Sequence, residues 1–392
     1  MAGWSRRQIV RSGVAAAAAA CAGNSFAATT GRERPEDSLD AIARRKGLRF
    51  GSALGGRGLR DPRYLELVTA QCGILVPENE LKMTSVQREP GVFDFARAEA
   101  LLQFAESHGM AVRGHTLLWH HPRWLPKWLE THDFGAEPAT AAAGLLEAHI
   151  RKAASFFGRR IVSWDVVNEA VDNVTGAMRE TLFSRAIGTP DQVVEMAFRI
   201  ARAQLPDTEL VYNDYMGWEK DSAAHRTGVL KLLERLRRNG APVNALGLQS
   251  HIGCGNQDAN AGREFDARDE REWRNFLREV TGMGYRLVIT EFDVHDGALA
   301  ASAKQRDRSI ASLARAFLDL TLDFREVSAV LCWGLADNFS WLQGRSPRQE
   351  GVAKRPTPFD SHYRPKPMRD AIAAALRSAP SRRPVIPQGE PA

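Results

Sequence analysis

Two stretches of this 392-residue chain end in carboxylates that could perform acid–base chemistry. One apolar, β-branched run ends in Asn168 and Glu169, and a second ends in Glu291 and Asp293. Short apolar runs of this kind are typical of buried strands, and strand ends are where α/β proteins bind ligands. Two carboxylates brought together can serve as an acid and as a base or nucleophile, which is the usual equipment for breaking a glycosidic bond.

The Asn168-Glu169 pair has a second interpretation as a helix cap, because both residue types are common near helix starts. If the pair is catalytic instead, the two glutamates must differ in protonation state. Burial near another carboxylate should raise the pKa of one glutamate, while hydrogen bonds to its charged form should keep the other ionised.

Eight short apolar runs along the chain alternate with longer segments of helical periodicity. Asp61 and Pro62 open one of these helices with a cap and an N1 proline, and 269–280 forms another. This alternation predicts an α/β fold, a single (β/α)8 TIM barrel with its active-site cleft at the carboxyl ends of the strands. The eight runs are 48–53, 73–76, 111–117, 161–167, 209–212, 245–248, 286–290 and 330–333.

Polar and aromatic residues follow nearly every one of these runs, in the same topological position. Tryptophans there can stack on sugar rings, while amides and charged groups can bind sugar hydroxyls. Random surface polarity would not collect in this way. The residues are Glu78, Asn79, Glu80 and Lys82; His115, Trp119, His120 and His121; Asn168 and Glu169; Asn213, Asp214 and Tyr215; Gln249, Ser250 and His251; Glu291 and Asp293; and Trp333, Asp337 and Trp341.

From about residue 49 to 368, the chain resembles the family 10 glycoside hydrolases, which are (β/α)8 endo-β-1,4-xylanases. The resemblance depends on seven motifs that occur in order and at barrel spacing. They read Pro-Glu-Asn at 77–79 with Lys82, Gly-His-Thr-Leu-Leu-Trp-His at 114–120, Trp-Asp-Val-Val-Asn-Glu-Ala at 164–170, Tyr-Asn-Asp-Tyr at 212–215, Gly-Leu-Gln-Ser-His at 247–251, Ile-Thr-Glu-Phe-Asp at 289–293 and Cys-Trp-Gly at 332–334.

The resemblance implies that Glu169 is the general acid/base and Glu291 the nucleophile of a retaining double displacement. Asn168 would bind the 2-hydroxyl of the sugar being cleaved. His251 would lie beside Glu291, with Asp293 and Gln249 orienting that pair.

The resemblance also implies a set of substrate-binding residues. Many members of the family carry Gln where this chain has Pro122, so one hydrogen bond to the sugar is missing or is supplied by His121. Glu78, Asn79 and Lys82 would bind the next sugar on the glycone side. His115 and Trp119 would form walls of the cleavage subsite, and Trp333 and Trp341 would form its ceiling. Tyr215 would contact the leaving group.

Several of these residues have plainer interpretations. The histidines could ligate a metal, but they lack a neighbouring Cys or a His-x-x-x-His pattern, so neither a metal nor another cofactor is expected. Trp164 lies inside a strand run and is expected in the core, and Glu80 is expected to be structural or solvated. Cys254 lacks an activating base, so it is not expected to be a nucleophile, and its pairing with Cys332 stays open.

The amino terminus suggests export. Residues 1–27 combine Arg6 and Arg7 with an alanine-rich run, which predicts a signal peptide of the twin-arginine type; an ordinary secretory signal and a lipoprotein anchor at Cys21 are the alternatives. Residues 28–46 form a lead-in, 47–378 the barrel, and 379–392 a disordered tail rich in proline and arginine. We therefore expect a periplasmic or secreted protein.

Net charge gives little sign of a nucleic-acid partner. Without the signal peptide, 50 basic and 47 acidic residues leave a charge of about +3, with no basic stripe. We expect a monomer that acts on xylan, without a nucleic-acid or membrane partner. The alternatives are a related barrel hydrolase for β-1,4-glucan or mannan, and a carbohydrate-binding protein on an inactive barrel, which should lack one of the two catalytic carboxylates.

Overall fold

The computed structural model describes residues 35–253, 266–300, 302–345, 348 and 351–385. Within these residues, nine strands form one sheet. They are β1 Arg49–Leu54, β2 Ile74–Pro77, β3 Ala111–Trp119, β4 Ser163–Asn168, β5 Glu209–Asp214, β6 Ala245–Leu248, β7 His251–Ile252, β8 Arg286–Val294 and β9 Val327–Cys332.

The strands close into a barrel because each of the eight ring strands pairs in parallel with two neighbours. Strand β1 pairs with both β2 and β9, and β6 pairs directly with β8. The two-residue strand β7 pairs only with the end of β8, so it lies outside the ring of eight. The predicted (β/α)8 barrel is confirmed.

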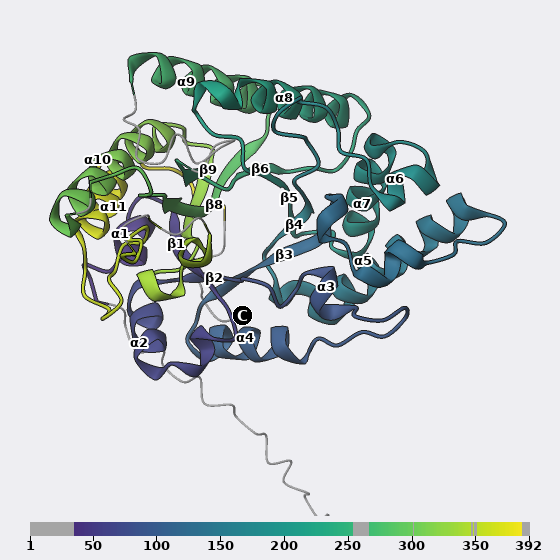
Figure 1. Cartoon of the computed structure of the whole chain (residues 1–392), viewed down its shortest axis with the longest axis horizontal. Helices are drawn as coiled ribbons and strands as arrows, with labels where there is room; N and C mark the ends of the chain where they lie inside the picture. The colour runs from purple at the N-terminus through teal and green to yellow at the C-terminus, as the bar shows by residue number, and fades with distance from the viewer. Residues whose placement is uncertain (1–34, 254–265, 301, 346–347, 349–350, 386–392) are drawn as a thin grey trace, which may run out of the picture. The chain divides into compact units, whose positions relative to one another are not determined.

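Helices surround the strands, as Figure 1 shows. Strand faces that point outward are packed against these helices, so both faces of the sheet are buried, as expected for parallel strands. The helices are α1 Leu39–Arg44, α2 Pro62–Gln71, α3 Met83–Val86, α4 Ala96–Ser107, α5 Pro138–Phe157, α6 Leu182–Ile187, α7 Pro190–Gln204, α8 Ala223–Arg238, α9 Ala267–Gly282, α10 Ala303–Leu322 and α11 Pro367–Ser378.

Local sequence explains where several helices begin. The Asp61 side chain accepts hydrogen bonds from the backbone of Arg63 and Tyr64, and Pro62 follows it, as the sequence predicted for α2. No helix begins at Glu169, where β4 leads into a loop, so the helix-cap interpretation of that pair is wrong.

Both ends of the described chain contribute to the base of the barrel. The expected lead-in contains α1, whose Asp40 accepts hydrogen bonds from Arg49 and from the backbone of Phe50. Residues 379–385 were expected to be disordered, and this expectation is wrong for them. Ala379 is buried, and the Arg382 guanidinium donates hydrogen bonds to carbonyl groups at the end of α10 and the start of β9, which fix the segment.

Other predictions concern residues outside the part of the chain that the structure describes. The signal peptide at 1–27, the rest of the tail at 386–392 and Cys254 belong to this group. Cys332 is buried as a free thiol. No helix in the described part of the chain is long and apolar enough to cross a bilayer.

Candidate active site

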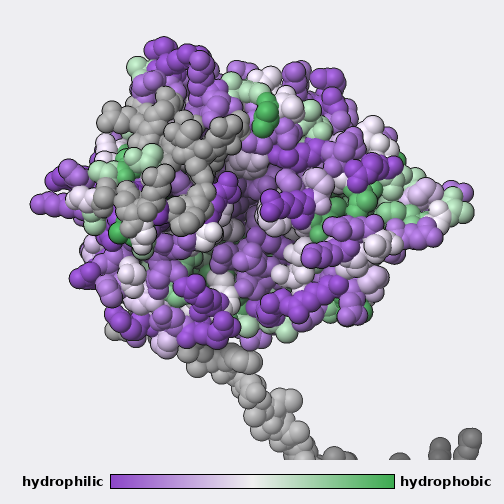
Figure 2. Space-filling model, viewed as in Figure 1, coloured by the Kyte–Doolittle hydropathy of each residue, from purple (hydrophilic) through white to green (hydrophobic). Residues whose placement is uncertain are grey.

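A cavity of about 940 Å³ opens at the carboxyl ends of the barrel strands. Figure 2 shows a largely hydrophilic face with a hollow near its centre. Every residue proposed from the sequence for catalysis or substrate binding lines this cavity, except Asp293, which lies directly behind it. The lining residues from that set are Glu78, Asn79, Lys82, His115, Trp119, Asn168, Glu169, Tyr215, Gln249, His251, Glu291, Trp333 and Trp341.

Glu169 follows the last residue of β4 and has a φ of 56°. Non-glycine residues rarely adopt this left-handed conformation, and such residues cluster at functional sites. Its Oε1 accepts hydrogen bonds from Asn168 at 3.2 Å and Gln249 at 2.9 Å. Burial raises the pKa of Glu169, the nearby charges of Asp214 and Glu291 add to the rise, and the hydrogen bond from Gln249 opposes it.

Glu291 lies on the opposite wall, on β8. Burial would raise its pKa, but a hydrogen bond from His251 and the electrostatic effects of His115 and His251 outweigh that effect and lower it. His251 Nε2 lies 3.2 Å from Glu291 Oε2. The two glutamates therefore have pKa values displaced in opposite directions, as an acid and a nucleophile require.

His251 is held as a cation by its second neighbour. Its Nδ1 lies 2.9 Å from Asp293 Oδ1, and Trp341 donates from its indole nitrogen to the other oxygen of Asp293 at 2.8 Å. Burial alone would lower the pKa of His251, but the charges and hydrogen bonds of Asp293 and Glu291 raise it to about 10. Strand β8 runs through Val294, so Glu291 and Asp293 point to the same face, as their spacing predicted.

Gln249 occupies a different place from the one that the resemblance implied. It was expected to orient the Glu291–His251 pair, but its amide donates to Glu169 Oε1 at 2.9 Å and to Asn168 Oδ1 at 3.3 Å. The side chain leaves the end of β6 toward β4, so it orients the acid/base side of the site instead.

Asn213 is a site residue to which sequence analysis gave no role. Its amide donates to Glu291 Oε1 at 2.8 Å and to Asn168 Oδ1 at 2.9 Å, and its oxygen accepts from the Thr290 hydroxyl at 2.7 Å. Asn213 thus connects the side of the site that carries Asn168 and Glu169 with the side that carries Glu291. Its place at the end of a strand, within the Tyr-Asn-Asp-Tyr motif at 212–215, was the signal in the sequence.

The glycone-side group lies after β2. Lys82 donates to Asn79 Oδ1 at 2.8 Å, and its pKa is lowered by burial, against the charges of Glu291 and Glu78. Burial raises the pKa of Glu78, although Lys82 opposes the shift. Glu80 accepts from the backbone of Gly56 at 2.7 Å, which fits the structural role expected for it.

The aromatic walls partly match expectation. His115 is fixed by Asp165, whose Oδ2 lies 2.9 Å from its Nδ1, and its ring lies 5.3 Å from the ring of Trp333. Trp333 is only 7% exposed and packs with the side chains inside the barrel. It therefore lies between the cavity and the barrel core, and its role as a ceiling of the cleavage subsite stays a prediction. Trp164 is fully buried, as expected.

Two further expectations concern the rims. The Tyr215 hydroxyl accepts a hydrogen bond from Arg179 at 2.9 Å, and burial raises the Tyr215 pKa. At the position of the missing glutamine, Pro122 begins a 3-10 turn, η2 Pro122–Trp124. His121 lines the cavity there, while its Nδ1 accepts from the backbone of Arg123.

The described residues contain no group of three or more His, Cys, Asp or Glu side chains that could hold a metal ion. His120 is buried, with its Nε2 3.0 Å from the Arg179 carbonyl oxygen, and burial lowers its pKa to about 4. His115, His121 and His251 each have a protein partner at one or both ring nitrogens.

Two glutamates at the mouth of a (β/α)8 barrel, with pKa values shifted in opposite directions, define a glycoside hydrolase of the barrel class. The chain belongs to glycosyl hydrolase family 10, whose sequence profile matches residues 38–375. The family resemblance found in the motifs is therefore confirmed.

Relatives with names and structures agree with this assignment. Endo-1,4-beta-xylanase B of Thermotoga neapolitana is 30% identical over 337 residues, which cover 85% of this chain and 90% of the relative. The crystal structure of native xylanase 10B from Thermotoga maritima matches with 31% identity and a TM-score of 0.76, over 86% of this chain and 98% of that one. Xylanase 10B from Thermotoga petrophila RKU-1, in complex with xylobiose, has 31% identity and a TM-score of 0.77, with 88% and 98% coverage.

Proposed function

We propose that this protein hydrolyses internal β-1,4-xylosidic bonds of xylan with retention of configuration. Glu291 attacks the anomeric carbon while Glu169 protonates the departing oxygen, and Glu169 then removes a proton from the water that releases the glycosyl enzyme. The observation that carries the proposal is the opposite displacement of the two pKa values in one cavity. The names of the relatives support xylan as the polymer.

The surrounding side chains have matching roles. His251 and Asn213 bind separate oxygens of Glu291, so the nucleophile is ionised and oriented before substrate arrives. Asn168 accepts hydrogen bonds from two neighbouring amides, so its own amide group is oriented beside Glu169, where it can bind the 2-hydroxyl. Retention predicts a carboxyl separation of about 5 to 5.5 Å, against roughly 6.5 to 9.5 Å for inversion.

The test uses paired substrates that differ in the acidity of the leaving group. Glu291→Ala should nearly abolish turnover of every substrate. Glu169→Ala should cost on the order of 10² to 10⁴ on xylan, whose leaving group needs a proton, and far less on activated aryl xylosides. Equal losses of Glu169→Ala on both kinds of substrate would refute its role as the acid.

The polymer is tested separately. Reducing-end release should be fastest on xylan, compared with carboxymethylcellulose and mannan, because Glu78, Asn79 and Lys82 leave little room for a 6-hydroxymethyl group. Preference for glucan or mannan would preserve the catalytic pair and contradict the assigned roles of these three residues.

A further inference from the structure

Two exposed arginines line the cavity without an assigned role. Arg345 lies with its guanidinium carbon 5.1 Å from the ring centre of Trp341, and Arg123 lies 5.1 Å from that of Trp124. The ion pairs formed among the described residues include neither of them, whereas Arg179, farther along the rim, pairs with Asp172. Both guanidinium groups are therefore oriented by an aromatic face and available to a ligand.

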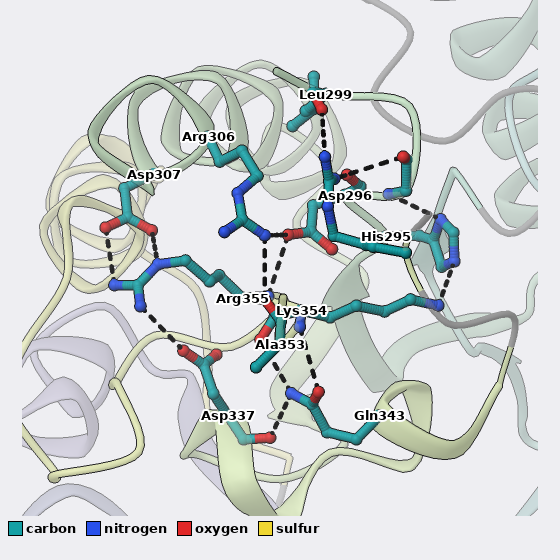
Figure 3. A network of polar contacts seen from close by, with 12 residues as sticks. His295, Asp296, Leu299, Arg306, Asp307, Asp337, Gln343, Ala353, Lys354 and Arg355 are labelled. Carbon is teal, nitrogen blue, oxygen red and sulfur yellow. Dashed lines mark hydrogen bonds and ion pairs between the residues drawn. The ribbon is translucent and has the colours of Figure 1, made fainter. Parts of the chain in front are cut away.

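The segment that carries Arg345 is held in place by a buried polar network (Figure 3). The Arg345 carbonyl accepts a hydrogen bond from the Lys354 ammonium, which is buried. Gln343 accepts from the Lys354 backbone at 3.1 Å and donates to the carbonyls of Lys354 and Asp337, both at 2.8 Å. These bonds fix η7 Trp341–Gly344, so Arg345 follows a rigid turn.

The network continues to the catalytic strand. His295 and Asp296 follow β8, and Lys354 Nζ lies 3.0 Å from His295 Nε2, while Arg306 donates to Asp296 at 2.8 Å (Figure 3). Trp341, which supports the Arg345 guanidinium, also donates to Asp293 on the same strand. The position of Arg345 is therefore set relative to Glu291.

Arg123 is presented from the β3 side by a second aromatic stack. Trp124 is 40% exposed, and its ring stacks on Trp119 with centroids 5.0 Å apart and planes at 24°. Trp119 in turn receives the Lys82 ammonium 4.7 Å from its ring centre. Pro122 opens this turn, so the residue that departs from the family pattern directly precedes the cation at the rim.

An unsubstituted xylan is neutral, and its hydroxyls need no fixed cations beyond those in the inner site. Guanidinium groups match carboxylates, which they bind by paired, charge-assisted hydrogen bonds. We propose that the cleft recognises xylan whose backbone carries uronic acid substituents, and that Arg123 and Arg345 bind their carboxylates. The proposal rests on the xylanase function above and names the decoration that the site selects.

The experiment compares glucuronoxylan with the same polymer after its carboxyl groups have been reduced to alcohols, so that shape is kept and charge is lost. For the wild type, kcat/KM should be about tenfold or more higher on the charged polymer, as expected for a charge-assisted hydrogen bond. Arg345→Gln and Arg123→Gln should each lower this ratio, and the double variant should bring it close to one.

The matched control is Arg63→Gln, which removes an exposed arginine that also lies over an aromatic ring, at Tyr363, but outside the cavity. Its ratio should equal that of the wild type. A fall in this ratio that is confined to Arg123→Gln or to Arg345→Gln would assign carboxylate binding to that arginine. Equal wild-type rates on the two polymers, or the same fall in Arg63→Gln, would overturn the proposal. Failure of the xylanase function is seen separately, as no cleavage of unsubstituted xylohexaose.

Discussion

At the scale of single residues, the site shows how identical side chains acquire different chemistry. Glu291 is buried and Glu169 is half-buried, and burial alone would raise both pKa values. Only Glu291 has a cationic imidazole as neighbour, and Asp293 is what keeps that imidazole charged. The proposed acid and the proposed nucleophile are therefore distinguished by the residues that surround them, and the pH dependence of catalysis should report this difference.

Removal of the imidazolium should shift the acidic limb of the pH profile. In His251→Gln, the Glu291 carboxylate loses a positive neighbour, so its pKa rises and the ionised nucleophile disappears at a higher pH. The acidic limb of kcat/KM against pH should therefore move upward, while the alkaline limb, set by protonated Glu169, should move less. His121→Gln is the matched control, because the pKa of His121 is lowered to about 4 and its loss removes no charge near neutrality. An unmoved acidic limb in His251→Gln would contradict this account.

Residue roles were predictable where a motif carries them and not where geometry decides them. The sequence identified both glutamates and the lysine and histidine that accompany them. It could not show that Gln249 reaches across to Glu169, or that Asn213 joins the two walls, because an amide at a strand end can turn to either neighbour. Such contacts depend on rotamers and on barrel curvature, which one-dimensional spacing does not contain.

At the scale of elements, the eight barrel strands were predictable because apolar runs of β-branched residues recur with helical segments between them. Strand β6 was predicted with its observed bounds, whereas β8 runs four residues beyond its predicted end. The extension carries Glu291 and Asp293, whose polar character ended the apolar pattern. Strand β7 was missed, since two residues give no periodicity. Polar functional residues at a strand end thus interrupt the apolar pattern by which the strand is predicted.

The glycine in β6 tests how closely one strand is fitted to the site. A methyl group at Gly247 would lie 2.2 Å from Asn213 Oδ1, so Asn213 must move away from Glu291. Gly247→Ala should lower kcat/KM by about 100-fold, the scale expected for a misplacement of about 1 Å. Gly144→Ala in α5 is the control, because that glycine faces open space in a helix, and the change should raise the free energy of unfolding by about 0.5–1 kcal/mol. Full activity in Gly247→Ala would show that the site tolerates the displacement.

At the scale of the whole molecule, the barrel separates chemistry from stability. The cavity and its carboxylates lie at the carboxyl ends of the strands, and the opposite end is closed by α1 and by residues 379–385. The Arg382 guanidinium donates to the carbonyls of Leu322, Phe324 and Val327 at 2.8 to 3.0 Å, and its backbone donates to Lys46. The segment therefore links both ends of the folded chain across the base.

This separation predicts a loss of stability without a loss of catalysis. Arg382→Ala removes a donor from several partly buried carbonyls, so the free energy of unfolding measured in urea should fall by about 1–3 kcal/mol. The value of kcat/KM on xylan should stay unchanged, because the base lies at the opposite end of the barrel from Glu169 and Glu291. Arg383→Ala, which changes an exposed neighbour, should alter neither quantity. Equal stability of the two variants would mean that the base is closed without help from Arg382, and a fall in kcat/KM would mean that the two ends of the barrel are coupled.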